Sequence, residues 1–471
     1  MSFAHALKWS FLSELASKAI QPVVFVFLAR LLTPEDFGVM TAAMMIIAFS
    51  QIFWEAGMGK ALIQRQTDIE AAANAAFWIN TALGLLIAVL LYLFAQPIAQ
   101  TFFQDDRVTA VLQVMTLQVL LGALASVQTA LLQKEMGFKK LFWVRFATVS
   151  LPGLASVPLA WYGWGYWALV VGTLVGQLVQ AVMLWCISNW RPNTKCNRLV
   201  FKEIFVFGAW VSVSGLLAWF YLWADSLVLG YCLGSHELGL YRTGNMAILI
   251  VFSMLSAPLT PVVYSWMSKK EKKQIPDVLK SIVNIMAIIF IPISILISGQ
   301  SDWISNLVFG EQWIGVESVL AVMSLSHGLS YLLIVNAEAY RAVNKPQYET
   351  YPMLLGVIVY LPVYMLSANL GLQVFLIARL ISMLTFGYIM HVVLARLCLR
   401  IEIWYFLKYA IIFAAAILTL FAAHFGQIAV NMNLISTVVS VVSFFIILTL
   451  NKSFYIDFYH RHVKKNSIAL R

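Results

Sequence analysis

The stretch FLARLLTPEDFG, residues 27–38, ends one apolar run and begins the next. Arg30 lies inside the first run, and Pro34, Glu35 and Asp36 follow in a short polar turn. The same alternation of long apolar runs and short polar turns continues along the chain. A helix needs roughly 20 apolar residues to cross the hydrocarbon core of a bilayer, and these runs have about that length. The pattern predicts a series of membrane-spanning helices.

Composition supports the same fold class. The 471 residues are 61% hydrophobic and only 11% charged, far from the average of soluble proteins. The ten-residue alternation of a membrane β-barrel is missing from the sequence, so we expect an all-α polytopic membrane protein. Glu14 and Lys18 interrupt the first run, which is not typical of a cleaved signal peptide. We therefore expect this run to remain as the first helix.

Charge and turn residues divide the chain into about fourteen predicted helices, each close to the length of one bilayer span. Their ranges are 9–32, 37–59, 75–103, 108–134, 138–162, 164–189, 203–231, 237–265, 275–298, 314–341, 348–368, 369–395, 404–424 and 429–451.

The basic residues indicate how these helices are oriented. Most of the 31 Lys and Arg lie in the two terminal segments or near the loops after every second helix, as in QKEMGFKK at 133–140 and SKKEKK at 268–273. Arg107 and Arg242 lie on the other side, together with eight of the 21 acids. Loops rich in Lys and Arg stay cytoplasmic, so both termini are predicted to be cytoplasmic. The net charge of +10 then reflects topology, and a nucleic-acid partner is not expected.

The sequence shows no motif of a nucleotide-binding domain, a metal site or a known hydrolase. The extramembrane segments are too short for a nucleotide-binding domain, and a GxxxxGK[ST] loop is missing. The four cysteines show no CxxC spacing, so we expect neither a disulfide framework nor a metal site. Zinc-protease and serine-hydrolase motifs are also missing, and we expect no cofactor and no enzymatic activity.

The two halves of the chain resemble each other. LARLLTPEDFGVM at 28–40 resembles VLGYCLGSHELGLYR at 228–242, and GWGYWALVVGTLVGQLVQ at 163–180 resembles NLGLQVFLIARLISML at 369–384. Repeats of this kind predict two bundles with substrate bound between them near the midplane. We expect six-helix bundles at 1–200 and 201–400 around a V-shaped cleft, with two further helices and a basic cytoplasmic tail at 401–471.

Several strings in order carry a family resemblance. LARLLTPEDFGVM, GMGKALIQR, LLQKEMGFKKL, GWGYWALV, ADSLVLGYCLGSHELGLY and LVFGEQW lie between residues 28 and 313. Together they resemble the Wzx-type lipid-linked oligosaccharide flippases of the multidrug/oligosaccharidyl-lipid/polysaccharide superfamily, in the branch of colanic-acid and teichuronic-acid exporters.

The resemblance implies a function and a location. Such proteins turn undecaprenyl-diphosphate-linked sugar repeat units across the bacterial inner membrane for cell-surface polysaccharides, including exopolysaccharide and lipopolysaccharide. The implied partners are the lipid-linked substrate, a proton or sodium ion, and the polymerase and chain-length machinery. The family motifs mark loops and packing, so the site residues must be inferred from physical chemistry.

Moving a diphosphate through a membrane requires a solvated cleft with cations, because charges are costly in hydrocarbon. Lys18 lies in the middle of the first predicted helix, and Glu14 is one turn earlier on the same face. We expect Lys18 to bind substrate and to form a protonatable cluster with Glu14 and Glu55, in which the two acids serve ion coupling. The alternative for Lys18 and Glu14 is an internal ion pair that only holds the helix in place.

Arg30 has two roles that the sequence leaves equally open. It lies close to a helix end, where it can extend to the interface and pair with Glu35 or Asp36. Alternatively it binds phosphate in bidentate fashion, which Arg does better than Lys.

Arg379 lies near the middle of its predicted helix, and we expect it to bind substrate in the cleft. Asp225 is the acid in the interior of the helix at 203–231 and is predicted to be the counter-ion of Arg379 or a proton carrier. His327 fits a hydrogen-bonded core histidine better than a proton relay, because no acid is near it in sequence.

Two other functions remain open at this stage. A cation-coupled multidrug antiporter of the same superfamily would share the architecture but is expected to carry acids in its cleft. A membrane polysaccharide polymerase is expected to carry a large periplasmic loop, and the longest one here, about 299–313, is too short to form a domain.

Overall fold

The computed structural model describes residues 20–55, 57–193, 198–256, 263, 267, 270–425 and 432–452. These residues are largely helical and include no β-strand. Twelve of the helices they form are long and apolar enough to cross a membrane, and one of these, α8 (Arg198–Ser256), joins two predicted spans. A shorter apolar helix, Ile20–Leu31, belongs to the first predicted span. The prediction of an all-α polytopic membrane protein is confirmed.

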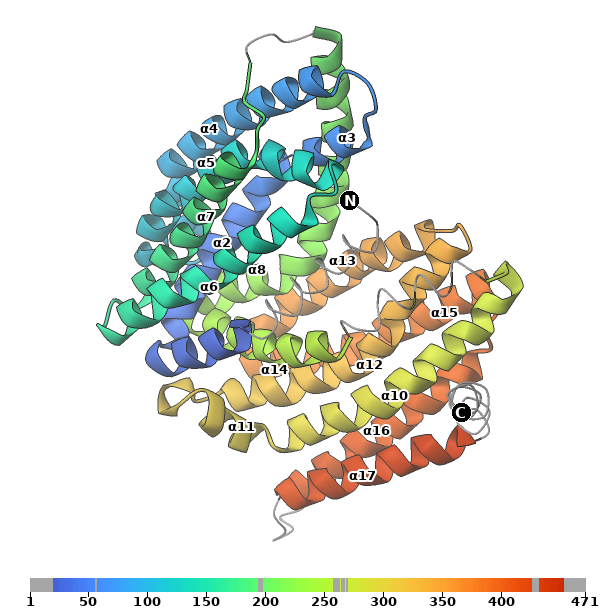
Figure 1. The fold of residues 1–471 in the computed structure, drawn as a ribbon. Coiled ribbons are helices and arrows are strands. Elements are labelled where there is room, and N and C mark those ends of the chain that lie inside the picture. The colour runs from blue at the N-terminus through green and yellow to red at the C-terminus, as the bar shows by residue number, and fades with distance from the viewer. Residues whose placement is uncertain are drawn as a thin grey trace, which may run out of the picture. The chain divides into compact units, whose positions relative to one another are not determined.

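The chain forms two compact units (Figure 1). The N-terminal unit comprises the described residues up to 243 together with 308–313. Besides Ile20–Leu31 and the first part of α8, its helices are α2 (Pro34–Glu55), α3 (Met58–Gln64), α4 (Ile69–Phe102), α5 (Asp106–Lys134), α6 (Phe138–Trp161), α7 (Tyr166–Ile187) and η2 (Glu311–Trp313).

The C-terminal unit comprises the described residues of 244–307 and 314–471. Its helices are η1 (Lys272–Gln274), α10 (Ile275–Gly299), most of α11 (Ser301–Val308), α12 (Val316–Ala342), α13 (Gln347–Ala368), α14 (Leu372–Ser382), η3 (Met383–Gly387), α15 (Tyr388–Leu399), α16 (Ile403–Phe425) and α17 (Met432–Leu450). The π-helical segment η3 lies within the span predicted at 369–395. The predicted division into bundles at residues 200 and 400 remains a prediction.

Helix α8 is interrupted at Gly234, where φ is 83° and ψ is −173°. Glycine adopts this conformation more readily than any residue with a side chain. Gly234 lies in the turn predicted between two spans. The neighbouring backbone lies directly against the start of α2: a Cβ on Gly239 would lie 1.8 Å from the Pro34 carbonyl oxygen. A Cβ on Gly38 would lie equally close to the Ser235 carbonyl oxygen. Glycine at these two positions therefore permits the contact between α2 and α8.

Polar contacts reinforce this end of the N-terminal unit, which we call the acidic end (residues 33–38, 103–107, 163–166 and 232–239). The Asp36 carboxylate accepts hydrogen bonds from the Thr33 hydroxyl at 3.0 Å and from the Tyr166 N–H at 2.8 Å. His236 Nδ1 lies 2.6 Å from Glu35 Oε1. The start of α2 is thereby joined to the start of α7 and to α8.

Asp105 is the second centre of the acidic end. Its carboxylate receives the Ser235 hydroxyl at 2.6 Å and the Arg107 guanidinium at 2.8 Å, and it caps α5 through the Arg107 N–H. Burial opposes ionisation of this carboxyl, but the hydrogen bonds from Arg107 and Ser235 outweigh burial and lower its pKa below the ordinary 3.8. Asp105 is therefore a charged structural anchor between α5 and α8.

Helices α6 and α7 pack through small residues. A Cβ on Gly172 would lie 1.8 Å from Ser156 Oγ, and one on Gly176 would lie 2.7 Å from Pro152 Cγ. Small residues at such contacts let helix backbones approach closely, which is the usual basis of helix association in membranes. Gly172 and Gly176 of GWGYWALVVGTLVGQLVQ thus serve packing.

Candidate functional site

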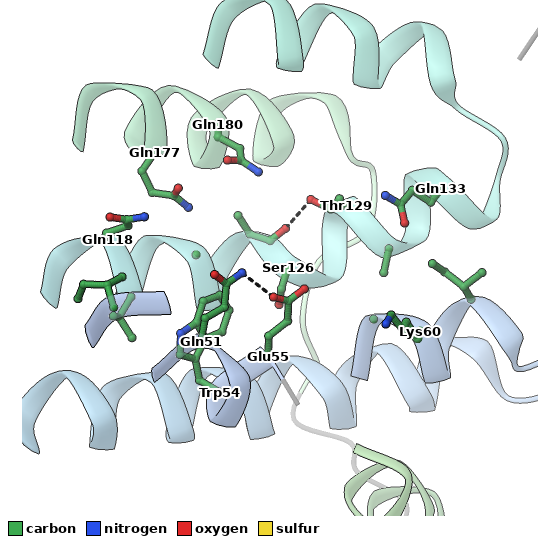
Figure 2. Close-up of a pocket in the computed structure, with 17 residues that line it drawn as sticks. Gln51, Trp54, Glu55, Lys60, Gln118, Ser126, Thr129, Gln133, Gln177 and Gln180 are labelled. Carbon is green, nitrogen blue, oxygen red and sulfur yellow. Dashed lines mark hydrogen bonds between the residues drawn. The ribbon is translucent and has the colours of Figure 1, made fainter. Parts of the chain in front are cut away.

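A polar cavity of about 310 Å³ lies within the N-terminal unit. Figure 2 shows that side chains from α2, α5 and α7 point into it, with α3 at one side. Five glutamines line it: Gln51, Gln118, Gln133, Gln177 and Gln180. The other polar residues of its wall are Glu55, Lys60, Ser126 and Thr129. We call this space the glutamine cavity.

The spacing of residues on α5 builds one wall of the glutamine cavity. Gln118, Gly122, Ser126, Thr129 and Gln133 recur every three or four residues and so occupy one helix face. Gln177 and Gln180 on α7 follow the same rule. These amides are not among the residues predicted from the sequence, although the periodic polar stripe within the predicted span 108–134 is a usable signal.

Hydrogen bonding in the glutamine cavity is incomplete. The Gln51 amide donates to the Glu55 carboxylate at 2.7 Å. Trp54 is only 6% exposed, and its indole N–H has no hydrogen-bond partner among the described residues. The buried carbonyl oxygen of Gln118 likewise has none within the described parts of the chain. Both atoms are too deeply buried to touch a molecule in the cavity, so the groups open to a ligand are the other polar side chains of the wall.

Gly122 determines how closely the wall approaches Trp54. A Cβ at this position would lie 2.8 Å from Trp54 Cη2 and 3.4 Å from Gln177 Nε2. The indole therefore packs directly on the α5 backbone, with its ring held against the cavity wall.

A second cavity of about 270 Å³ adjoins the first and shares Thr129, Gln133 and Gln180 with it. It adds Arg145 and the aromatic ring of Phe142, both from α6. The two spaces form one polar tract inside the N-terminal unit.

Charged side chains also gather at residues 60–68 and 134–140, next to the glutamine cavity. We call this region the basic end of the unit. Lys134 Nζ donates to the Ile63 carbonyl at 3.0 Å and to the Arg65 carbonyl, and Arg65 pairs with Glu203 at 2.8 Å. These contacts join α3, α5 and α8.

The structure describes some of the predicted site residues. Lys18 and Glu14 lie outside the described residues. Glu55 lines the glutamine cavity, whereas Arg30 and Asp225 are not part of its wall. Among the described residues, no group of three or more His, Cys, Asp or Glu is arranged to hold a metal ion.

Asp225 lies in α8 and is only 8% exposed. Its carboxylate accepts hydrogen bonds from the Ser226 N–H at 2.6 Å and from the Tyr241 hydroxyl. Tyr241 follows the break at Gly234, so this contact bridges the two arms of α8 within the N-terminal unit. Asp225 and Tyr241 come together across the turn at Gly234, and the sequence alone does not indicate this contact.

Arg379 lies on α14 in the C-terminal unit and its guanidinium contacts α12, with the Ser326 hydroxyl oxygen at 3.3 Å and Met323 Sδ at 3.4 Å. The neighbouring His327 Nε2 lies 2.8 Å from the amide oxygen of Asn245 and, with its proton on Nε2, donates to it. That arrangement agrees with a hydrogen-bonded core histidine.

Arg30 is exposed near the end of Ile20–Leu31. Residues 308–313 hold the backbone around Arg30 in place. The Trp313 indole donates to the Ala29 carbonyl at 2.7 Å, and Gln312 donates to the Arg30 carbonyl at 3.0 Å. The buried Trp313 ring packs on Phe37. LVFGEQW, one of the strings that carried the family resemblance, therefore holds the helix that presents Arg30.

Several known proteins are similar to this chain in sequence. At 26% identity the chain is similar to the succinoglycan biosynthesis transport protein ExoT of Rhizobium meliloti (strain 1021), over 68% of this chain and 65% of that protein. At 24% identity it is similar to the teichuronic acid biosynthesis protein TuaB of Bacillus subtilis (strain 168), over 73% and 72% of the two chains.

Solved structures share the fold. The lipid II flippase MurJ in an inward closed conformation matches with a TM-score of 0.75 at 13% identity, over 95% of this chain and 100% of that one. An inward-facing multidrug resistance MATE family transporter matches with a TM-score of 0.60 at 13% identity, over 86% and 96%. The sequence model described as "Polysaccharide biosynthesis protein" matches residues 27–318, more than half of the chain. The chain therefore belongs to this polysaccharide biosynthesis protein family.

Proposed function

We propose that this protein is a flippase that moves lipid-linked oligosaccharide repeat units across the bacterial inner membrane for cell-surface polysaccharide synthesis. The observation that carries the proposal is the family match over residues 27–318. The transport protein for succinoglycan among its relatives supports it, as does the fold shared with a lipid II flippase. The protein itself forms and breaks no covalent bond.

The proposed orientation follows from charge. The basic end of the N-terminal unit faces the cytoplasm, where Lys and Arg are retained, and the acidic end faces the periplasm. Both termini are then cytoplasmic. The polymerase and chain-length machinery are proposed to receive the product on the periplasmic side.

The proposed mechanism is alternating access. Lys18, Arg30 and Arg379 bind the diphosphate headgroup while the polyprenyl tail stays in the lipid, because a charged headgroup needs cations and solvent to cross hydrocarbon. Glu14, Glu55 and Asp225 are proposed to carry the coupling proton or sodium ion. Of these, Glu55 lines the glutamine cavity, where a bound cation can reach its carboxylate.

A multidrug antiporter is the second candidate, because a MATE family transporter shares the fold. A site for organic cations is expected to be rich in acids, whereas the glutamine cavity has one carboxylate, Glu55, balanced by Lys60. This neutral, hydrogen-bonding wall favours an uncharged polar ligand. Accumulation of a cationic dye in a deletion strain would instead favour the antiporter.

Purified protein in sealed vesicles with a labelled lipid-linked oligosaccharide tests the proposal. We expect the label to change leaflet with its chemical structure intact. A labelled polymer would identify a polymerase, and a label that stays in its original leaflet would contradict transport.

Substitution of Arg379 tests the proposed headgroup contact. We expect Arg379→Ala to abolish export while leaving insertion and folding intact, because a guanidinium is lost from the path of a diphosphate. Arg396→Ala, an exposed arginine of the same unit, is the matched control. Full export by Arg379→Ala would remove this residue from the mechanism.

A further inference from the structure

We infer that the glutamine cavity is a binding site for a sugar ring of the transported oligosaccharide. The inference rests on the proposed function and adds a subsite to it, inside the N-terminal unit. It starts from the polar wall of the cavity, into which five glutamine side chains converge.

The chemistry of the wall matches sugar hydroxyls. Each glutamine amide both donates and accepts hydrogen bonds, as each hydroxyl of a sugar does. The hydroxyls of Ser126 and Thr129 on the same wall can also donate and accept. The part of the Trp54 ring that lines the cavity adds apolar surface, which suits the apolar face of a pyranose.

Other ligand classes fit the wall less well. Calcium needs 6–8 oxygen ligands, usually with several carboxylates, and Glu55 is the one carboxylate among the lining residues. A free phosphate needs more positive charge than Lys60 alone supplies next to Glu55. An apolar drug would leave the amides without partners.

The space is large enough for the proposed ligand. A volume of about 310 Å³ is far above what a single water needs and leaves room for one hexose ring. The adjoining cavity continues past Thr129, Gln133 and Gln180, so a second ring of the same oligosaccharide can follow. The tract therefore accepts part of a sugar chain.

The test uses saturation-transfer NMR on the full-length protein in lipid nanodiscs. The probes are the methyl glycosides of glucose, galactose and N-acetylglucosamine. The variant Gln118→Leu/Gln177→Leu removes amides from two facing walls at similar side-chain volume. Gln113→Leu is the control, since this glutamine is also on α5 but donates to the Tyr92 carbonyl outside the cavity.

We expect at least one glycoside to bind the wild type, and the double variant to bind it at least about tenfold more weakly, as lost hydrogen bonds of ~1 kcal/mol each predict. The control variant should bind as the wild type does. If the double variant fails to fold, Gln180→Leu alone replaces it. Absence of binding across the panel, or equal binding by the variants, overturns the inference.

The vesicle assay separates this inference from the proposed function. A protein that flips its substrate but binds no glycoside in the glutamine cavity contradicts the inference alone. A protein that binds glycoside there but leaves the lipid-linked substrate in place contradicts the proposed function alone.

Discussion

The acidic end and the glutamine cavity of the N-terminal unit use polar residues in opposite ways. At the acidic end the charged groups of Glu35, Asp36 and Asp105 are met by His236, Tyr166 and Arg107 at hydrogen-bonding distance. In the glutamine cavity the polar groups are mostly neutral amides that face an open space. Polar groups that bond one another stabilise helix contacts, whereas amides that face a cavity remain able to bond water or a ligand.

The largest expected effect is a loss of folding from Gly239→Ala. The added Cβ would lie 1.8 Å from the Pro34 carbonyl oxygen, and backbone cannot yield as a flexible side chain does. We expect destabilisation of at least about 3 kcal/mol, measured by heat unfolding and by the amount of monodisperse protein. Gly59→Ala, whose Cβ meets nothing closer than 3.6 Å, is the control. Wild-type stability in Gly239→Ala would show that the acidic end is loosely packed.

The next effect is on transport, from Thr129→Trp. Thr129 lies between the two cavities, so an indole there fills space that we assign to sugar. We expect export to fall at least about tenfold, equivalent to ~1.4 kcal/mol, while the heat-unfolding temperature changes little. Leu117→Trp adds the same side chain to an exposed position of α5 and should export normally. Equal export by both variants would assign the glutamine cavity to packing alone.

A smaller effect is expected from Asp105→Asn. The Asp105 side chain is 12% exposed, so its contacts with Ser235 and Arg107 are only partly screened by water. Asparagine keeps one acceptor but loses the charge, and we expect a loss of about 1 kcal/mol in unfolding free energy with transport retained. Asp106→Asn, at the exposed neighbour, should change stability by less. A transport defect without a stability defect would place the acidic end in the transport path.

The smallest effect is a pH dependence of stability. The pKa of Asp105 is lower in the folded protein than its ordinary 3.8. Its contribution to stability is therefore complete above the unfolded pKa and is lost as the pH falls through the folded pKa. Unfolding temperatures measured from neutral to acidic pH should fall more steeply for the wild type than for Asp105→Asn. Parallel curves would mean that Asp105 is not the titrating group.

The sequence predicts the fold better than it predicts the site. Hydropathy and turn residues locate most spans, because bilayer thickness limits helix length. The break at Gly234 follows from glycine in a polar turn. By contrast, the bonds between Asp225 and Tyr241 and between Ser235 and Asp105 depend on tertiary contacts that no local pattern encodes.

The site was hard to predict for a second reason. Charged residues inside spans draw attention because they are costly in lipid, so Arg379 and Glu55 were selected and the glutamines were not. Neutral amides carry a smaller penalty and appear as ordinary interruptions of an apolar run. Their meaning becomes visible only when α2, α5 and α7 bring them to one cavity.

The central claim, that the substrate enters a hydrated cavity in the N-terminal unit, is tested most directly by labelling Thr129→Cys with a water-soluble maleimide. Mass spectrometry of peptides separates this site from the four native cysteines. Thr116→Cys, at a buried position of the same helix, is the control. We predict that Thr129→Cys reacts faster than the control and that added lipid-linked oligosaccharide slows its reaction. Failure of Thr129→Cys to react, or a rate that the substrate leaves unchanged, would contradict the account.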